Sequence, residues 1–353
     1  MSKLGNVALL ALSIFLLAGC TANASTTTGG RPTSAASTLK LGFLANVTHA
    51  PALIGLKQGF ITKNLGPTKI STEIFDAGPA AIEALSSGAI DAAYIGPSPA
   101  INSYIKSAHA SLRVVSGATY GGAQLVVRPG IISPHQLTGA RLATPQLGNT
   151  QDVALRWWLK GQGLSSKLSG GGDVAVTPTE NAQTLMLFKS KKLDGAWVAE
   201  PWASRLVLEA GAHVLVNEAD LWVGGKFPTT QLVVSLSYFR AHPAAVSGLV
   251  AANLEAVNWL NANPSNAASA INTALAEYAG KALPAEVLDR ALKFVHFSVD
   301  PLAHTATTLL DRAVAVGVGT RGSLKNLYDL DALNAILRAT GAESLPSGRS
   351  KRQ

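Results

Sequence analysis

The chain has 353 residues, of which 47% are hydrophobic and 14% are charged. This composition supplies sizeable cores and argues against disorder. The formal net charge is +8, but Lys and Arg are scattered, with their densest cluster at Lys189, Lys191 and Lys192, so nucleic acid is not expected as a partner. Between the two polar ends lie about 310 residues, more than a single hydrophobic core usually serves, which predicts two lobes.

The N-terminal segment has the pattern of an export signal. Lys3 precedes an apolar run over residues 7–17, which is shorter than the roughly 20 residues of a membrane-spanning helix. The run ends in Leu17-Ala18-Gly19-Cys20, which resembles the lipobox of bacterial lipoproteins, and Cys20 is the only cysteine in the chain. We therefore interpret residues 1–19 as a lipoprotein signal peptide and Cys20 as the lipidated residue. An ordinary signal peptide with an incidental cysteine is the alternative.

Polar segments flank the folded body. Beyond Cys20, the segment up to residue 38 consists mainly of Thr, Ser, Ala and Gly, and it has too little apolar surface to offset the entropy of ordering. Residues 20–38 are thus predicted to be the lipidated cysteine and a flexible tether. Residues 346–353 are predicted to be a disordered tail. The protein is expected on the outer face of the cytoplasmic membrane, either in a periplasm or on a Gram-positive surface.

Within the body, short apolar runs alternate with helical patterns, which predicts an α/β fold in which each lobe has a mostly parallel sheet flanked by helices. The first set of expected strands covers residues 39–44, 90–95, 113–115 and 124–127, with helices at 51–58, 79–86 and 98–106. The second set covers 141–144, 174–176, 196–198 and 214–216, with helices at 150–160 and 182–190. A strand at 232–235 returns to the first lobe, and helices at 242–262, 284–292, 302–318 and 330–340 follow.

An internal repeat supports two related lobes. Residues 90–100 align without gaps with residues 193–203. In each copy an aspartate, Asp91 or Asp194, precedes a buried strand, and a turn with proline leads into another helix. Each aspartate is either a turn former or a site residue. The turns lie at the carboxyl ends of strands, where open α/β sheets bind ligands.

The predicted lobes are discontinuous in sequence. Lobe 1 is expected to comprise residues 39–127 and 230–345, and lobe 2 residues 128–229. The chain would cross between them near 127–129 and near 228–233. Such an architecture suits capture of a ligand in the cleft by hinge closure.

The body resembles the substrate-binding proteins of the sulfonate, nitrate and taurine import family, most of all the aliphatic-sulfonate branch. The resemblance extends in order from about residue 39 to about residue 340. The segments that carry it are LGFLANVTHAP (41–51), FDAGPAAIEAL (75–85), residues 90–100, ATPQLGNTQD (143–152), DGAWVAEPWA (194–203) and GKFPTT (225–230).

The resemblance implies a two-lobed, periplasmic-binding-protein-like fold of type II. It further implies a monomer that captures a small organosulfur anion and delivers it to a membrane permease energised by a cytoplasmic ATPase. Taurine, nitrate, bicarbonate and a pyrimidine precursor are the alternative ligands, and a lipoprotein that senses its ligand without transport is the alternative function.

Two predicted turns are candidates for holding the anion. Gly96, Pro97 and Ser98 lie between a strand and a helix, where backbone N–H groups and the positive end of the helix dipole favour an anion. Gly148, Asn149, Thr150 and Gln151 offer the same arrangement in the other lobe, with Gly148 expected to permit close approach of the ligand. The alternative is that Ser98, Asn149 and Thr150 only cap their helices.

Other candidates follow the first strand or line the predicted crossings. The resemblance implies that Asn46 and Thr48 touch the ligand, whereas His49 is a structural histidine or the start of the next helix. Trp202 either packs on an apolar ligand tail or belongs to the core. Glu200 either accepts from a ligand amine or hydroxyl or bonds to backbone across the cleft. Thr229, Thr230 and Gln231 at the return crossing are hinge candidates, and Thr230 is also expected to line the cleft.

Signatures of catalytic and metal sites are missing from the sequence. The seven histidines show no HxH or HExxH spacing, and no GxSxG occurs, which argues against a metal site and a serine nucleophile. The glycine-rich residues 169–173 are not followed by Lys-Ser/Thr and are interpreted as a surface turn. We expect neither enzymatic activity nor a cofactor.

Overall fold

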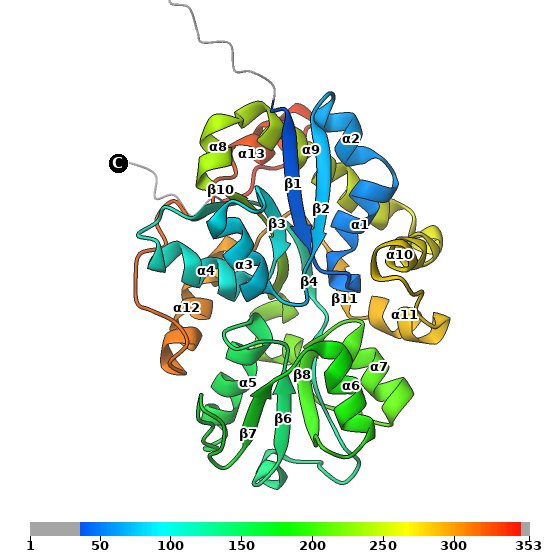
Figure 1. Ribbon diagram of the computed structural model, residues 1–353, viewed down its shortest axis with the longest axis vertical. Helices are drawn as coiled ribbons and strands as arrows, with labels where there is room; N and C mark the ends of the chain where they lie inside the picture. The colour runs from blue at the N-terminus through cyan, green and yellow to red at the C-terminus, as the bar shows by residue number, and fades with distance from the viewer. Residues whose placement is uncertain (1–35, 347–353) are drawn as a thin grey trace, which may run out of the picture. The chain divides into compact units, whose positions relative to one another are not determined.

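Two mixed sheets organise the protein in the computed structural model (Figure 1). The structure describes residues 36–346. The predicted signal peptide, Cys20, most of the predicted tether and nearly all of the predicted tail therefore lie outside the described residues.

The first sheet has six strands in the order β11-β4-β10-β3-β1-β2. β1, β2 and β3 are parallel to one another, β10 is antiparallel to both β3 and β4, and β11 is antiparallel to β4. Four of the six strands therefore point the same way. The bounds are β1 (Thr38–Phe43), β2 (Lys69–Ile74), β3 (Ala92–Ile95), β4 (Leu112–Gly121), β10 (Pro228–Ser235) and β11 (Val295–Phe297).

The second sheet repeats this plan with five strands in the order β7-β6-β8-β5-β9. β6 is parallel to β7 and β8, and β5 is antiparallel to β8 and β9. In each sheet the reversed strand beside the third parallel strand, β10 or β5, is the one that arrives from the other lobe. The bounds are β5 (Ala123–Val127), β6 (Arg141–Thr144), β7 (Ala175–Pro178), β8 (Gly195–Ala199) and β9 (His213–Asn217).

The repeated aspartates have the same structural role in both lobes. A carboxylate oxygen of Asp91 accepts a hydrogen bond from the Lys40 backbone N–H at 2.8 Å, and one of Asp194 accepts from the Arg141 N–H at 2.8 Å. These bonds tie the start of the third parallel strand to the start of the first. Both aspartates thus lie at the strand ends remote from the predicted ligand turns, and the turn-forming interpretation is the correct one.

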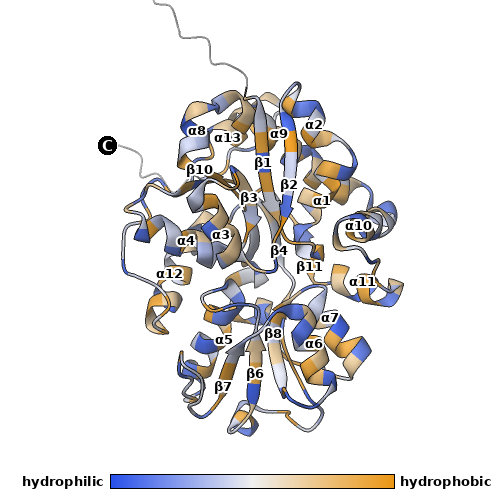
Figure 2. Ribbon diagram, viewed as in Figure 1, coloured by the Kyte–Doolittle hydropathy of each residue, from blue (hydrophilic) through white to orange (hydrophobic). Residues whose placement is uncertain are grey.

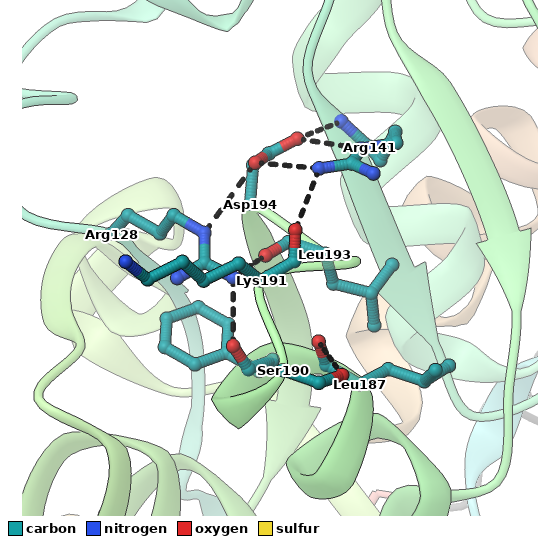
Figure 3. A network of polar contacts seen from close by, with 8 residues as sticks. Arg128, Arg141, Leu187, Ser190, Lys191, Leu193 and Asp194 are labelled. Atoms are coloured by element: carbon teal, nitrogen blue, oxygen red, sulfur yellow. Dashed lines mark hydrogen bonds and ion pairs between the residues drawn. The ribbon is translucent and has the colours of Figure 1, made fainter.

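The copy in the second lobe is reinforced by charge. Figure 3 shows Asp194 between Arg128 and Arg141, whose side-chain nitrogens lie 3.4 and 3.1 Å from its oxygens. Burial opposes ionisation of Asp194, but the hydrogen bonds from Arg141 and the charges of both arginines outweigh it and hold the pKa of Asp194 below its ordinary value. Arg128 also donates to the carbonyls of Phe188 and Leu193. Arg128 and Asp194 together thus anchor the end of the helix that precedes Asp194, α6 (Asn181–Lys189).

Helices cover both sheets, and their apolar faces form the cores. In Figure 2, α11 carries hydrophobic and hydrophilic residues together, in keeping with buried Val287 and Leu288 beside exposed Glu286 and Asp289. The first-lobe helices are α1 (Ala50–Lys57), α2 (Phe60–Leu65), α3 (Gly78–Ser87), α4 (Pro97–Lys106), α8 (Leu236–Ala241), α9 (Pro243–Ala262), α10 (Pro264–Ala279), α11 (Ala285–Leu292), α12 (Ala306–Ala315) and α13 (Asp331–Ala339). The second-lobe helices are α5 (Thr150–Gly161), α6 (Asn181–Lys189) and α7 (Trp202–Ala210). Within residues 36–346, no helix is both long and apolar enough to cross a membrane.

The first passage between the lobes lies earlier than predicted. β4 ends in the first sheet at Gly121 and β5 begins in the second at Ala123, so the predicted passage at 127–129 and the lobe boundary at residue 127 are wrong. Gly121 and Gly122 have φ values of +77° and +72°, in the left-handed region where glycine is favoured. This glycine pair makes the turn between the sheets, and no apolar pattern marks it.

The return passage ends at Pro228, where β10 joins the first sheet. The predicted region 228–233 thus begins at the right residue but extends into a strand that already belongs to lobe 1. Gly121 donates its backbone N–H to the Phe227 carbonyl at 3.1 Å, so the two passages lie side by side. The second lobe accordingly spans residues 123–227.

Candidate functional site

Loops at the carboxyl ends of strands from both sheets meet around one small cavity of about 30 Å³. They follow β1, β2 and β3 in the first lobe and β6, β7 and β8 in the second. We call it the polar cavity. It is lined by Leu44, Asn46, Thr48, His49, Asp76, Gly78, Gly96, Pro145, Asn149, Gln151, Asn181, Ala199 and Thr229. Five of the predicted site residues are among them, namely Asn46, Thr48, Gly96, Asn149 and Gln151.

The loop after β1 presents buried Asn46, Thr48 and His49 to the polar cavity. His49 accepts a hydrogen bond at Nδ1 from the Leu44 backbone N–H at 3.2 Å, which leaves the proton of the neutral ring on Nε2. Burial lowers the pKa of His49 to about 3, so the imidazole is uncharged at neutral pH. His49 is thus both a structural residue of this loop and a lining residue of the cavity.

In the second lobe, the N-terminus of α5 is held by internal hydrogen bonds. Asn149 is the N-cap, and its side-chain oxygen accepts from the Gln151 N–H at 2.9 Å. Fully buried Asp152 accepts from the Thr144 hydroxyl at 2.9 Å and the Gly148 N–H at 3.0 Å. It also forms a buried ion pair with Arg156 at 2.9 Å. The loop that carries Asn149 and Gln151 is therefore preorganised without a ligand contact.

Gly148 has a conformational role that the sequence analysis did not anticipate. Its φ is +75°, in the left-handed region where glycine is favoured, and a Cβ atom placed there would meet no protein atom within 4 Å. Its N–H already donates to Asp152. Gly148 is not among the residues that line the polar cavity.

The first turn of α4 has fewer free donors than its position predicts. Pro97 and Pro99 occupy the first and third helical positions and have no N–H. The intervening Ser98 N–H donates to the Thr150 hydroxyl at 3.3 Å, across the lobes. A Cβ atom on Gly96 would lie 2.5 Å from that hydroxyl, so Gly96 is required for this close approach. The helix end that was expected to bind the anion instead contacts Thr150.

Two further predicted residues, Glu200 and Thr230, are not in the lining of the polar cavity. Glu200 is fully buried, accepts from the Ser204 N–H at 3.0 Å and pairs with Arg290 of the first lobe at 3.1 Å. Burial raises the pKa of Glu200, although the bonds from Ser204 and Arg290 oppose this. Thr230 is buried, and its hydroxyl has no hydrogen-bond partner among the described residues. Its neighbour Thr229 lines the cavity and bonds to the Gly121 carbonyl.

Trp202 separates the polar cavity from a larger one. Its indole N–H donates to the Asn46 side-chain oxygen across the lobes at 3.0 Å. The larger cavity, about 440 Å³, lies between the α10–α11 connection and the helices α6 and α7; we call it the outer chamber. It is lined by Ala45, Ala182, Pro201, Trp202, Arg205, Glu209, Leu275, Ala279, Lys281, Ala282, Leu283 and Pro284.

Sequence reasoning missed Asp76 and Asn181. Asp76 follows β2, an edge strand that was not predicted because its sequence KISTEI is mostly polar and exposed. Asn181 begins α6, and its side-chain oxygen is buried without a partner among the described residues. The only available signal was proximity to a strand end, since Asp76 lies two residues after β2 and Asn181 three residues after β7.

The polar cavity combines many uncharged donors with a single carboxylate. Amide and hydroxyl groups come from Asn46, Thr48, Asn149, Gln151 and Asn181, and Asp76 is the only acidic lining residue. Lys and Arg are absent from this lining. Among residues 36–346 no three His, Cys, Asp or Glu side chains are grouped so that they could hold a metal ion.

The size of the polar cavity bears on how a ligand enters. Pockets that bind small molecules usually measure roughly 300–1,000 Å³, far more than the 30 Å³ found here. The direct contacts Ser98–Thr150 and Trp202–Asn46 close the space between the lobes. A solute larger than a water molecule would therefore enter by separation of the lobes at the two passages.

Comparison with known proteins identifies relatives of the whole body. The NMT1-like family model matches residues 33–275. A binding protein of Brucella abortus (strain 2308) is 27% identical over 195 residues, which are 55% of this chain and 58% of that protein. The taurine-binding periplasmic protein of Escherichia coli K12 is 24% identical over 214 residues, 61% of this chain and 64% of that protein. The chain thus spans less than two thirds of the length of these curated relatives.

Solved structures share the fold. The alkanesulfonate-binding protein SsuA from Xanthomonas axonopodis pv. citri, bound to MOPS, matches with a TM-score of 0.67 at 22% identity, covering 81% of this chain and 95% of that one. The nitrate-binding protein NrtA from Synechocystis PCC 6803 matches with a TM-score of 0.74 at 18% identity, covering 89% of this chain and 92% of that one. These similarities confirm the predicted two-lobed, periplasmic-binding-protein-like fold.

Proposed function

Since the chain belongs to the NMT1-like family, we propose that it is the solute-binding component of an ABC importer. In this function the lobes close around a small anionic solute and present it to a membrane permease that a cytoplasmic ATPase energises. The protein works as an exported monomer, tethered through lipidated Cys20. A lipoprotein that senses the same solute without transporting it is the alternative.

The observation that carries this proposal is the position of the polar cavity. Six loops from two similar sheets converge on it, and within residues 36–346 the chain crosses between the lobes only at the two adjacent passages Gly121–Gly122 and Phe227–Pro228. Two bodies that rotate about such a double connection can open the cavity and enclose what enters it. No arrangement of nucleophile and base is needed for capture and release.

We propose an aliphatic sulfonate as the ligand. A sulfonate has three acceptor oxygens, which suit the amide and hydroxyl donors of Asn46, Thr48, Asn149 and Gln151. The dipole of α5 adds a favourable positive end on the same side. The outer chamber, with Leu275, Leu283 and Trp202 in its wall, supplies the apolar surface that an inorganic anion such as nitrate or bicarbonate would not use.

Asp76 favours taurine as a second candidate. Its carboxylate lies in the lining of the polar cavity, where it would repel a bare anion and attract an ammonium group. Taurine carries an ammonium group and a sulfonate, so it would satisfy both the carboxylate and the donors. A related protein from Escherichia coli is named as taurine-binding.

A thermal-shift panel tests these assignments. It would contain alkanesulfonates, taurine, nitrate, bicarbonate, sulfate and pyrimidines. A ligand at 100 times its dissociation constant stabilises the folded state by about 2.7 kcal/mol. A shift with sulfonates supports the proposal, whereas a shift with nitrate or a pyrimidine alone would keep a binding function and overturn the ligand. If no compound raises the melting temperature, solute binding itself is contradicted.

Asp76→Asn separates the two sulfonate candidates. If taurine is the ligand, the substitution should weaken taurine binding at least tenfold because the ammonium group loses its counter-charge, and ethanesulfonate binding should not weaken. If an unsubstituted alkanesulfonate is the ligand, removal of the like charge should strengthen ethanesulfonate binding. Titration calorimetry with both compounds distinguishes these outcomes.

A further inference from the structure

The outer chamber is large enough to hold part of a ligand. At about 440 Å³ it falls within the range of small-molecule pockets, roughly 300–1,000 Å³. Its first-lobe wall comes from the end of α10, including Leu275, and from the α10–α11 connection, including Leu283. Its second-lobe wall comes from α6 and α7, including Ala182 and Trp202. Because both lobes form it, the chamber changes shape whenever the lobes move.

Only one layer of residues separates the outer chamber from the polar cavity. Ala45 lines the chamber and the next residue, Asn46, lines the cavity; Ala182 and Asn181 divide in the same way. The remaining part of the partition is Trp202, which lines the chamber and donates its indole N–H to the Asn46 oxygen at 3.0 Å. The Trp202–Asn46 hydrogen bond is thus a contact between the lobes at this partition.

The charged residues that line the outer chamber favour the apolar part of a ligand that is an anion overall. Arg205 lies over the Trp202 ring at 4.6 Å and is paired with Glu209 at 2.7 Å, so its charge is balanced. Lys281 lies in the lining, is exposed and makes no salt bridge within residues 36–346. The excess positive charge attracts an anionic amphiphile, while leucine and tryptophan side chains accept its hydrocarbon part.

We infer that the outer chamber is a binding site for the hydrocarbon tail of a sulfonate whose head group lies in the polar cavity. The inference rests on the proposed function. The tail passes the partition when the Trp202–Asn46 hydrogen bond opens, and the indole ring then packs against it. The chamber thereby selects sulfonates by tail length and apolarity, which the polar cavity alone does not read.

Titration calorimetry with linear alkanesulfonates, from methanesulfonate to hexanesulfonate, tests the inference on the full chain. The dissociation constant should fall about fourfold for each added methylene, the change that corresponds to about 0.8 kcal/mol. Ala182→Asp introduces a charge into the chamber at an exposed position in the first turn of α6, where a carboxylate is compatible with the helix. It should reduce the ratio of hexanesulfonate to methanesulfonate affinity at least tenfold.

Gln183→Asp is the matched control, because it adds the same charge at the next exposed position of α6 outside the chamber lining. Its affinity ratio should equal that of the unmodified protein. Binding of methanesulfonate without any dependence on chain length would overturn the chamber assignment and leave the proposed function standing. So would a chain-length dependence that persists in Ala182→Asp. Failure of every sulfonate, methanesulfonate included, would overturn both the sulfonate assignment and the chamber.

Discussion

Two arginines of the first lobe reach the second lobe, one beside each passage, and they do so by different chemistry. Arg290 on α11 donates to Glu200 at 3.1 Å, to the Ser204 hydroxyl at 2.9 Å and to Gln124 at 2.9 Å. Arg312 on α12 lies between the Trp157 and Trp222 rings, 3.8 and 3.9 Å from their centroids. Within residues 36–346, its only hydrogen bond to the second lobe is a long one, 3.4 Å, to the Leu221 carbonyl.

Each contact is linked to a passage. Gln124 follows Gly122 closely, and the Glu200 N–H donates to the Gly122 carbonyl at 2.8 Å. Trp222 stacks on Phe227, which precedes the return strand. Hydrogen bonds are directional and break when partners rotate, whereas stacked rings tolerate sliding. The hydrogen bonds of Arg290 therefore fix the orientation of the first passage, whereas the stacking of Arg312 leaves the second passage freer to turn.

The buried carboxylates beside the two arginines, Glu200 and Glu218, also differ in how they contact their arginine. Glu200 is bonded directly to its arginine. Glu218 accepts instead from the Trp197 indole N–H at 2.8 Å, and Arg312 acts on it only through its charge. Burial raises the pKa of Glu218 to about 7, so this carboxyl group can become neutral near physiological pH.

Arg290→Met should have the largest effect, because it leaves Glu200 buried without its counter-charge. Removing one partner of a buried ion pair typically costs 3–5 kcal/mol, and we expect about 3 kcal/mol in the free energy of unfolding. Methionine preserves the apolar packing over Phe294, on which the guanidinium lies at 5.0 Å. Urea denaturation monitored by tryptophan fluorescence measures the loss.

The double variant Arg290→Met with Glu200→Gln is the control for this explanation. Glutamine removes the buried charge and retains an acceptor for the Ser204 N–H, so the pair should recover at least half of the lost stability. A single variant that costs less than 1 kcal/mol would mean that Arg290 does not fix the passage.

The second prediction concerns how the stability of the protein depends on pH through Glu218 and His49. Because the folded-state pKa of Glu218, about 7, exceeds the ordinary value of 4.5, its contribution to stability is fully present below pH 4.5 and is lost as the pH rises through 7. His49 acts in the opposite direction. Its pKa falls from 6.5 to about 3 on folding, so its contribution is present above pH 6.5 and is lost as the pH falls towards 3.

Glu218→Gln should therefore expose the effect of His49. In the unmodified protein the two contributions partly cancel between pH 4.5 and 6.5. Without Glu218, acidification over this range should lower the free energy of unfolding by roughly 2 kcal/mol more than in the unmodified protein. Denaturation curves at several pH values measure the slopes. Identical slopes in the two proteins would contradict a raised pKa at Glu218.

The sequence was sufficient to predict the elements that repeat and the edge of the sheets at which they meet. The alignment of residues 90–100 with 193–203 anticipated the matching places of β3 and β8, and with them Gly96 in the lining of the polar cavity. Asn149 and Gln151, which the sequence predicts to bind the ligand, both line the polar cavity, because a helix start after a strand end has a fixed position in such sheets.

Features that depend on long-range contacts were beyond the local pattern. The polar edge strand β2 was missed, and Asp76 with it. The helix α10 was not predicted as a separate element, and the predicted helix 302–318 shortened to α12. Arg290 meets Glu200 across 90 positions of the chain, so nothing near Glu200 in the sequence indicated that an arginine, rather than a ligand, occupies its carboxylate.

Arg312→Met should have the smallest effect, about 1 kcal/mol in the free energy of unfolding at pH 6. The thioether still packs between the two indole rings, and no carboxylate loses a hydrogen bond. Loss of the Arg312 charge should raise the pKa of Glu218 further. The loss in the free energy of unfolding should therefore grow between pH 6 and pH 8, where the ionised carboxylate is no longer compensated.

Arg312→Lys is the matched control, since it keeps the charge but not the planar stacking group. If stacking holds this passage, the lysine variant should be no more stable than the methionine variant at pH 6. A methionine variant as unstable as Arg290→Met would show instead that both arginines act as buried ion pairs, and the contrast between a fixed and a turning passage would fail.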